Sequence, residues 1–184
     1  MEHFYEKIQG WFSFPNLYSY AVEISPDKSH FVEVGVWKGT SASYMGVEIL
    51  NSGKNIKFDC IDPFIPVGDE MVEYKITHED LKNQFIDNMK PLEGRYTLYT
   101  LGSPEVTKMY KEKSLDFVFI DGSHKYEDVV NDIKAWIPKI KKGGILAGHD
   151  YTSGWPDVVK AVDDVLGEGE WKDKWDNSCW MIRF

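Results

Sequence analysis

The sequence contains few cysteines, no long apolar run and no amino-terminal leader pattern. Its two cysteines, Cys60 and Cys179, each lie in an apolar, strand-like stretch, which favours buried reduced thiols over a disulfide framework or a metal cluster. No apolar run reaches the roughly 18 residues of a membrane span. Residues 1–10 also lack a basic region followed by an apolar one. We therefore expect a cytoplasmic protein that does not enter a membrane.

Positive charge is also scarce. The 184 residues include 30 acidic and 21 basic side chains, a net charge of −9, and they form no lysine-rich or arginine-rich stripe. Nucleic acid is therefore not expected as a partner. A short basic stretch, residues 139–144, is interpreted as a helix carboxyl terminus, where lysines offset the helix dipole and glycines end the helix.

Strand-like and helix-like segments alternate along the chain. Thr77 with Asp80 is typical of a capping box, and Pro156 suits a first helical position. The expected helices are residues 16–24, 41–50, 77–89, 126–140 and 156–166, and the expected strands are residues 31–35, 56–62, 95–102, 115–122, 143–150 and 178–184, with residues 170–175 as a hairpin partner of the last. This alternation predicts an α/β fold, a Rossmann-like, doubly wound, mostly parallel sheet with an antiparallel carboxyl-terminal strand.

The length and composition predict one domain. With 42% hydrophobic residues, the chain can bury one substantial core and is short for two, so residues 1–184 are interpreted as a single domain. Within this domain we expect residues 1–28 to form a helical cover at one edge of the sheet. Residues 63–76 are a long connection at the ligand side and are the best candidate for a substrate-facing lid.

The stretch FVEVGVWKGTSASYM, residues 31–45, reads as a strand, a glycine-containing turn and a helix. Gly35 and Gly39 bracket this turn, but Trp37 stands where a dinucleotide fingerprint needs a glycine for the pyrophosphate. Lys38 precedes Gly39 instead of following it, so the phosphate loop of nucleotide triphosphatases does not fit either. The turn is predicted to hold a ligand without phosphates.

Polar residues stand at the carboxyl end of every predicted strand, where ligands bind in such sheets. Asp62 ends the second strand, and an acid at this position can accept two hydrogen bonds from a ribose diol. The pattern therefore indicates a nucleoside ligand. The alternative is that Asp62 only opens the turn before Pro63.

The sequence resembles the class I S-adenosylmethionine-dependent methyltransferases. Their first motif, E-x-G-x-x-x-G-x-S, is matched by Glu33, Gly35, Gly39 and Ser41. The segments GWFS, VFIDGSHKYED, GGILAGHDY and AVDDVL resemble a small branch with an Asp-Gly-x-His motif, akin to the catechol and macrocin O-methyltransferases. The resemblance extends from Gly10 to about residue 166.

This resemblance implies a set of cofactor contacts for S-adenosylmethionine. The methionine end would lie at the turn, where a helix amino terminus and an acid suit its carboxylate and ammonium groups. For two of the implied binding residues a structural role is the alternative: Trp37 could pack at the sheet edge, and Ser103 could cap a short helix. The implied binding residues are Glu33, Gly35, Trp37, Gly39 and Thr40 or Ser41 at the methionine end, Asp62 at the ribose, Gly102 and Ser103 at the adenine, and Asp121 beneath the methionine.

Two mechanisms of methyl transfer fit the remaining polar residues. Asp121 and Asp150 end neighbouring strands and could together bind a divalent cation such as Mg²⁺ that acidifies a substrate hydroxyl. The catechol-type relatives have an Asp-Asn pair where this chain has His149, Asp150 and Tyr151. The alternative is metal-free general base catalysis by His124 or His149, and in a third reading these residues are structural.

The resulting prediction is an S-adenosylmethionine-dependent methyltransferase that acts on a hydroxyl group of a small metabolite or sugar. A nucleotide-linked oxidoreductase is the alternative enzyme class, and Trp37 at the dinucleotide glycine position disfavours it. A third candidate is an S-adenosylmethionine-binding protein without methyl transfer, because 184 residues leave little room for an acceptor domain. In a homo-oligomer, partner subunits could complete the pocket.

Overall fold

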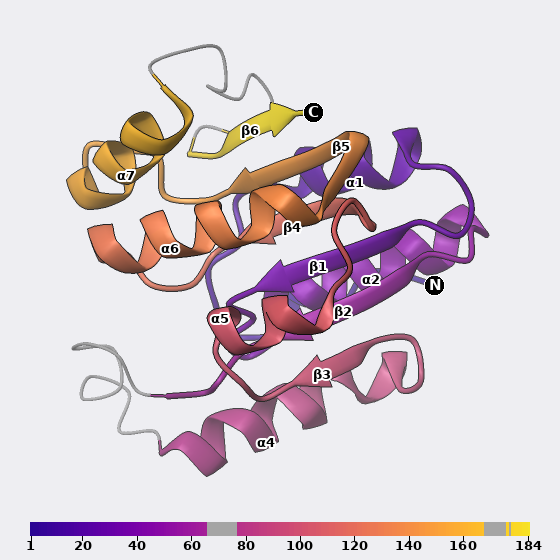
Figure 1. Cartoon of the computed structure of the whole chain (residues 1–184). Helices are drawn as coiled ribbons and strands as arrows, with labels where there is room; N and C mark the ends of the chain where they lie inside the picture. The colour runs from indigo at the N-terminus through magenta and orange to yellow at the C-terminus, as the bar shows by residue number, and fades with distance from the viewer. Residues whose placement is uncertain (66–76, 168–175, 177) are drawn as a thin grey trace.

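A computed structural model describes residues 1–65, 77–167, 176 and 178–184 of the chain (Figure 1). These residues form one six-stranded sheet with the strand order β3-β2-β1-β4-β5-β6. β1 to β5 pair in parallel and β6 runs antiparallel to β5, which confirms the predicted Rossmann-like sheet. The strands are β1 (His30–Val34), β2 (Lys57–Ile61), β3 (Thr97–Tyr99), β4 (Leu115–Ile120), β5 (Ile140–Gly148) and β6 (Trp180–Arg183). The strand order reverses between β1 and β4, so a ligand is expected at their carboxyl ends.

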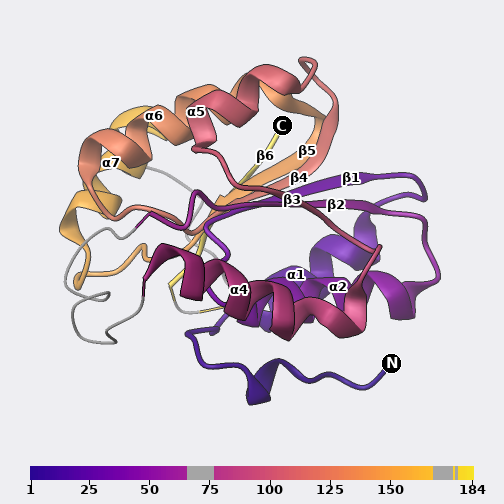
Figure 2. The same ribbon diagram turned by 90° about the horizontal axis from the view of Figure 1, so that it is seen from below.

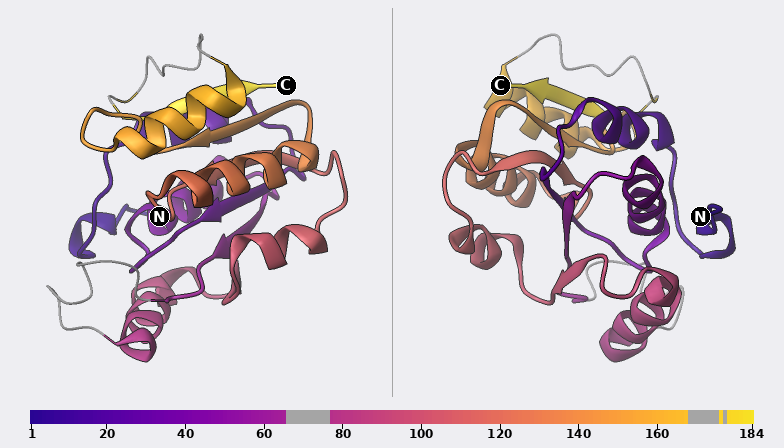
Figure 3. Two further views of the ribbon diagram at one scale, coloured as in Figure 1. Left: turned by 60° about the vertical axis from the view of Figure 1, so that its left-hand side comes forward. Right: turned by 90° about the vertical axis from the view of Figure 1, so that its right-hand side faces the viewer.

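Helices cover both faces of the sheet, as Figure 2 and the right-hand view of Figure 3 show. One layer consists of α1 (Pro15–Ile24), α2 (Thr40–Ser52) and α4 (His78–Met89), and the other of α5 (Ser103–Val106), α6 (Tyr126–Trp136) and α7 (Pro156–Leu166). Short 3₁₀ turns span Tyr5–Lys7, Lys90–Leu92, Thr107–Met109 and Ile137–Lys139. Each layer encloses its own apolar cluster against the sheet. Among the described helices, none has the length and apolarity needed to cross a membrane.

Helix α1 covers a face of the sheet, so the predicted position at a sheet edge is wrong. Its residue Tyr18 is fully buried and contacts Phe117 and Phe119 of β4 edge-on, with ring centroids 5.9 and 5.0 Å apart. Leu17 and Ala21 are buried in the same cluster. Burial of these side chains stabilises the fold through apolar surface removed from water, and it fixes the amino-terminal segment near the centre of the sheet.

The predicted helix starts are confirmed, and one predicted helix end is wrong. α4 begins with the capping box of Thr77 and Asp80, and α7 begins at Pro156. The basic stretch 139–144 does not end a helix, because α6 stops at Trp136 and β5 already begins at Ile140. Pro138 explains this early end, since its ring and its missing N–H disrupt helical hydrogen bonding.

Two predicted features lie largely or wholly outside the described residues. The candidate lid is described only up to residue 65, and its residues 66–76 lie outside. The proposed hairpin partner, residues 170–175, lies wholly outside. The lid therefore stays a prediction. Both cysteines are buried, as predicted, and neither forms a disulfide in the described part of the chain.

Asp176, near the carboxyl end of the chain, caps the amino terminus of α1. Phe14 stands at the N-cap position and offers no capping oxygen. Instead, one carboxylate oxygen of Asp176 accepts a hydrogen bond from the Leu17 amide at 2.9 Å, and the other accepts one from the Asn16 side chain at 3.2 Å. Asp176 is 9% exposed, so these bonds are shielded from water. The contact ties the two ends of the chain together.

Replacement of Asp176 by alanine is expected to destabilise the protein by about 1–2 kcal/mol, because α1 loses its capping carboxylate. Urea unfolding followed by circular dichroism measures this change. The matched control is Asp87→Ala, which removes an acid whose side chain is 65% exposed and is expected to change stability by less than about 0.5 kcal/mol. Equal stability of the two variants would contradict a capping role for Asp176.

Candidate active site

The turn after β1 lies against the end of β4. Gly35 has a φ of +84° and its amide donates a hydrogen bond to the Ile61 carbonyl at 2.8 Å. A Cβ atom at Gly35 would lie 2.0 Å from the carbonyl oxygen of Asp121, a distance at which no side chain fits. Only glycine therefore allows the two strand ends to approach this closely.

Asp62 holds the turn in place. One oxygen of its carboxylate accepts hydrogen bonds from the amides of Val36 and Trp37, both at 2.9 Å, and the other accepts one from Phe64 at 2.7 Å. Trp37 has a φ of +46°, a strained value for a bulky residue, and the bond to Asp62 helps to hold it. Burial raises the pKa of Asp62, and the three amides oppose that shift. Asp62 thus opens the turn before Pro63 as the alternative predicted, and its ribose role stays a prediction.

Glu33 is a buried acid directly beneath the turn. It is 1% exposed, and one of its oxygens accepts a hydrogen bond from the Ser41 hydroxyl. Its second oxygen, Oε2, is buried and has no partner of good hydrogen-bond geometry among the described residues, although the equally buried Tyr18 hydroxyl lies close enough to the carboxyl to lower its pKa. Burial, with a smaller contribution from the charge of Asp121, raises the pKa of Glu33 to about 8 against the lowering effects of the Ser41 and Tyr18 hydroxyls. A buried carboxylate whose acceptor sites are not all used favours a cationic ligand group.

The helix α2 starts at this turn without a side-chain cap. Gly39 is its N-cap residue, with a φ of +91°. The Thr40 hydroxyl points to the carbonyl of Ile8, and the Ser41 hydroxyl points to Glu33, so neither caps the helix. Uncapped amides at a helix amino terminus suit an anionic group such as the carboxylate of methionine.

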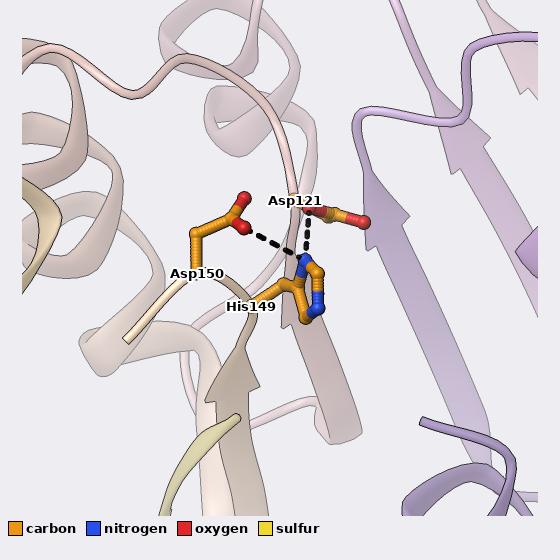
Figure 4. Close-up of side chains that lie close together, drawn as sticks. All are labelled: Asp121, His149 and Asp150. Carbon is orange, nitrogen blue, oxygen red and sulfur yellow. Dashed lines mark ion pairs between the residues drawn. The ribbon is translucent and has the colours of Figure 1, made fainter. Parts of the chain in front are cut away.

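Two acids and a histidine meet at the carboxyl ends of β4 and β5 (Figure 4). The Nδ1 atom of His149 lies 3.5 Å from Asp121 Oδ1 and 3.1 Å from Asp150 Oδ1. One ligand atom from each residue fits within 4.8 Å of the others, which is close enough for a shared metal ion. The three side chains are 14–19% exposed, so the group is partly shielded and still accessible. This confirms that the two predicted acids end neighbouring strands.

The charges of this group shift its pKa values strongly. Burial alone would lower the pKa of His149, but hydrogen bonding and charge from Asp121 and Asp150 outweigh it and raise the pKa to about 10. Burial alone would raise the pKa of Asp150, but His124 and His149 hold it well below its ordinary range. Asp150 also has a left-handed backbone, with a φ of +62°. Strained residues with perturbed pKa values are typical of functional sites.

The other predicted histidine, His124, lies on the far side of Asp150. Its Nε2 atom is 2.8 Å from Asp150 Oδ2, and its ring stacks on Trp155 with centroids 3.8 Å apart. Asp150 therefore contacts both histidines. The sequence predicted no role for Trp155, because its stacking partner His124 is distant from it along the chain.

At the predicted adenine end, the structure gives Ser103 a structural contact. Its hydroxyl accepts a hydrogen bond from the indole N–H of Trp136 at 2.8 Å. The N-cap of α5 is Gly102 and no side chain caps this helix, so the alternative that Ser103 caps it is wrong. The adenine role of Gly102 and Ser103 stays a prediction.

Comparison with known proteins identifies the family. A family model described as a methyltransferase domain matches residues 32–151. The chain belongs to this family. The match includes the glycine turn and the acidic strand ends, and it confirms the methyltransferase resemblance. The protein R132 of Acanthamoeba polyphaga mimivirus is 28% identical over 145 residues, which cover 77% of this chain and 61% of that protein. The chain thus spans less than two thirds of this curated relative.

Solved methyltransferase structures have the same fold. The O-methyltransferase NovP superposes with a TM-score of 0.66 and 19% identity, covering 92% of this chain and 78% of NovP. CalS11, a TDP-rhamnose 3'-O-methyltransferase of calicheamicin biosynthesis, superposes with a TM-score of 0.61 and 18% identity, and the match covers 92% of this chain and 77% of CalS11. A putative rRNA methylase from Clostridium thermocellum superposes with a TM-score of 0.65 and 13% identity, and the match covers 95% of this chain and 98% of the methylase. At these identities the likeness shows the fold and leaves the acceptor open.

Replacement of Gly35 by alanine is expected to abolish binding of S-adenosylhomocysteine, because the new Cβ would push the turn away from Asp121. Titration calorimetry on the purified variant measures this loss. Gly53→Ala is the matched control, since Gly53 also has a positive φ, +69°, but faces open space. The Gly53→Ala variant should lose about 1–2 kcal/mol of folding stability, because alanine is strained at a positive φ, and it should bind S-adenosylhomocysteine normally. Normal binding by Gly35→Ala would contradict the close approach.

Proposed function

We propose that the protein transfers the methyl group of S-adenosylmethionine to a hydroxyl group of a small molecule, with a divalent cation at the acceptor side. The observation that carries this proposal is the position of Asp121. Its backbone touches Gly35 of the turn, and its side chain belongs to the group with His149 and Asp150. A methyl donor on the turn and an acceptor at this group would therefore be neighbours.

The turn fits the methionine end of the methyl donor. Glu33 offers a buried carboxylate with unused acceptor sites, which suits the ammonium group, and the start of α2 offers uncapped amides for the carboxylate. Backbone amides use three of the four acceptor sites of the Asp62 carboxylate, two on Oδ2 and one on Oδ1, so Oδ1 could still accept a hydrogen bond from a ribose hydroxyl. When bound, the donor supplies an electrophilic methyl on a sulfonium.

Binding of S-adenosylhomocysteine at pH 7 is expected to release a proton from Glu33. Its pKa of about 8 keeps the carboxyl mostly protonated at pH 7, and an adjacent ammonium group favours the ionised form. Titration calorimetry in two buffers with different ionisation enthalpies, both with EDTA, measures the release. It should disappear in Glu33→Gln at the same pH. An unchanged release in Glu33→Gln would contradict this assignment.

The group of Asp121, His149 and Asp150 fits a divalent cation. Two carboxylate oxygens suit Mg²⁺ or Mn²⁺, and an imidazole nitrogen is accepted by Mn²⁺ and other transition metals. When bound, such a cation acidifies and orients an acceptor hydroxyl. The residues of the chain would position the acceptor, which is the main requirement for displacement at a methyl group.

A histidine base is the second candidate mechanism. His149 with a pKa near 10 is protonated at neutral pH, so it cannot accept a proton there without a change in its surroundings. His124 is the better candidate base, because Asp150 lies 2.8 Å from its Nε2 atom and would stabilise the imidazolium that proton abstraction forms. This arrangement needs no metal, and chelation therefore separates the two mechanisms.

A small hydroxylated metabolite or sugar is the acceptor that we propose. The activity of CalS11 as a TDP-rhamnose 3'-O-methyltransferase supports a sugar hydroxyl. The acidic net charge of −9 opposes binding to RNA, although the putative rRNA methylase from Clostridium thermocellum has the same fold. The cytoplasmic location and a homo-oligomer remain parts of this proposal that rest on the sequence alone.

Asp150→Asn is expected to lower turnover at least roughly tenfold while binding of S-adenosylhomocysteine stays unchanged, because the change removes a cation ligand and leaves the turn intact. A panel of sugar and phenol acceptors with radiolabelled S-adenosylmethionine measures turnover. Asp157→Asn, on the exposed first turn of α7, is the matched control. EDTA should reproduce the loss and added Mn²⁺ should reverse it. Full turnover in EDTA, lost in His124→Ala, would favour the histidine mechanism instead.

A further inference from the structure

Two serines from opposite ends of the chain hold the outer nitrogen of His149. Ser13 Oγ lies 3.0 Å from His149 Nε2, and Ser178 Oγ lies 2.7 Å from the same atom. The two hydroxyls are 3.4 Å apart, so they form a small hydrogen-bonded group with the ring. Phe14 packs against the imidazole, with ring centroids 4.9 Å apart. The ring is therefore fixed from the side that faces away from the two acids.

The segment that carries Ser13 is also tied to the cofactor turn. Lys38 donates a hydrogen bond to the Gln9 side chain at 2.5 Å, and the Thr40 hydroxyl lies 3.5 Å from the Ile8 carbonyl. Gly10 packs so closely on Thr40 that an added Cβ would lie 2.3 Å from its hydroxyl oxygen. Residues 8–13 thus run from the turn to His149 and are held at both ends.

This arrangement decides which nitrogen of His149 faces the two acids. A neutral imidazole has one N–H, and the nitrogen without it can bind a cation. Without a cation, Nδ1 donates its proton toward Asp121 and Asp150. A cation would displace this proton and use the lone pair of Nδ1, and the serine hydroxyls can accept the N–H that stays on Nε2. Metal-binding histidines are commonly oriented in this way by a hydrogen bond at their other nitrogen.

We infer that Ser13 is a positioning residue of the cation site, acting through His149 together with Ser178. The inference rests on the proposed function, because it concerns the cation proposed there. Ser13 contacts neither the cation ligands Asp121 and Asp150 nor the cofactor turn in the structure's hydrogen bonds. Its effect is therefore specific to the orientation of one ligand, and it makes the amino-terminal segment part of the active site.

The experiment measures Mn²⁺ binding by electron paramagnetic resonance in the full-length protein saturated with S-adenosylhomocysteine. Ser13→Ala is expected to weaken Mn²⁺ binding roughly 10-fold to 100-fold, since a hydrogen bond behind a metal ligand is lost. Ser13→Thr keeps the hydroxyl and should restore most of the affinity. Ser19→Ala is the matched control, because its hydroxyl contacts Tyr44 on the helical layer away from this group.

The remaining outcomes distinguish this inference from the proposed function. Wild-type Mn²⁺ affinity in Ser13→Ala and in the double variant Ser13→Ala/Ser178→Ala would overturn the positioning role and leave the cation site standing. No Mn²⁺ binding by the wild-type protein would overturn both the cation and the role of Ser13. Binding of S-adenosylhomocysteine in each variant reports on folding and should stay unchanged.

Discussion

The contact between Gly35 and the carbonyl of Asp121 is the constraint on which the site depends. β1 and β4 are neighbours where the strand order reverses, and their ends meet because Gly35 has no side chain. The amide of Asp121 donates to the Val34 carbonyl at 2.7 Å, which locks the same junction. This packing joins a turn suited to a nucleoside methyl donor to a group of side chains suited to a cation. Both parts are consequently placed by a rigid sheet, as efficient positioning requires.

Electrostatics link the two parts of the site. Glu33, Asp62, Asp121 and Asp150 gather at the carboxyl ends of adjacent strands, and the charge of Asp121 already raises the pKa of Glu33. In the protein alone, His149 offsets two of these acids. The ligands that we propose, an ammonium, a sulfonium and a divalent cation, would each bring positive charge. The excess of acids is therefore better explained by binding of cationic groups than by stability, since clustered like charges oppose folding.

The sequence predicted the parts of the fold that depend on local patterns. Strand and helix alternation, the capping box of Thr77 and the helix start at Pro156 all follow from neighbouring residues. The end of α6 was mispredicted because Pro138 outweighs the lysine and glycine pattern after it. Contacts between distant segments could not be predicted in this way. Ser13 meets His149 across 136 positions, and no spacing rule signals such a pair.

The central claim is that the turn after β1 binds S-adenosylmethionine and not a dinucleotide. Calorimetric titration of the wild-type protein with S-adenosylhomocysteine and, separately, with NAD⁺ tests this claim most directly. The account predicts saturable binding of S-adenosylhomocysteine and no binding of NAD⁺, because Trp37 stands where a pyrophosphate needs a glycine. Saturable binding of NAD⁺ without binding of S-adenosylhomocysteine would contradict the account.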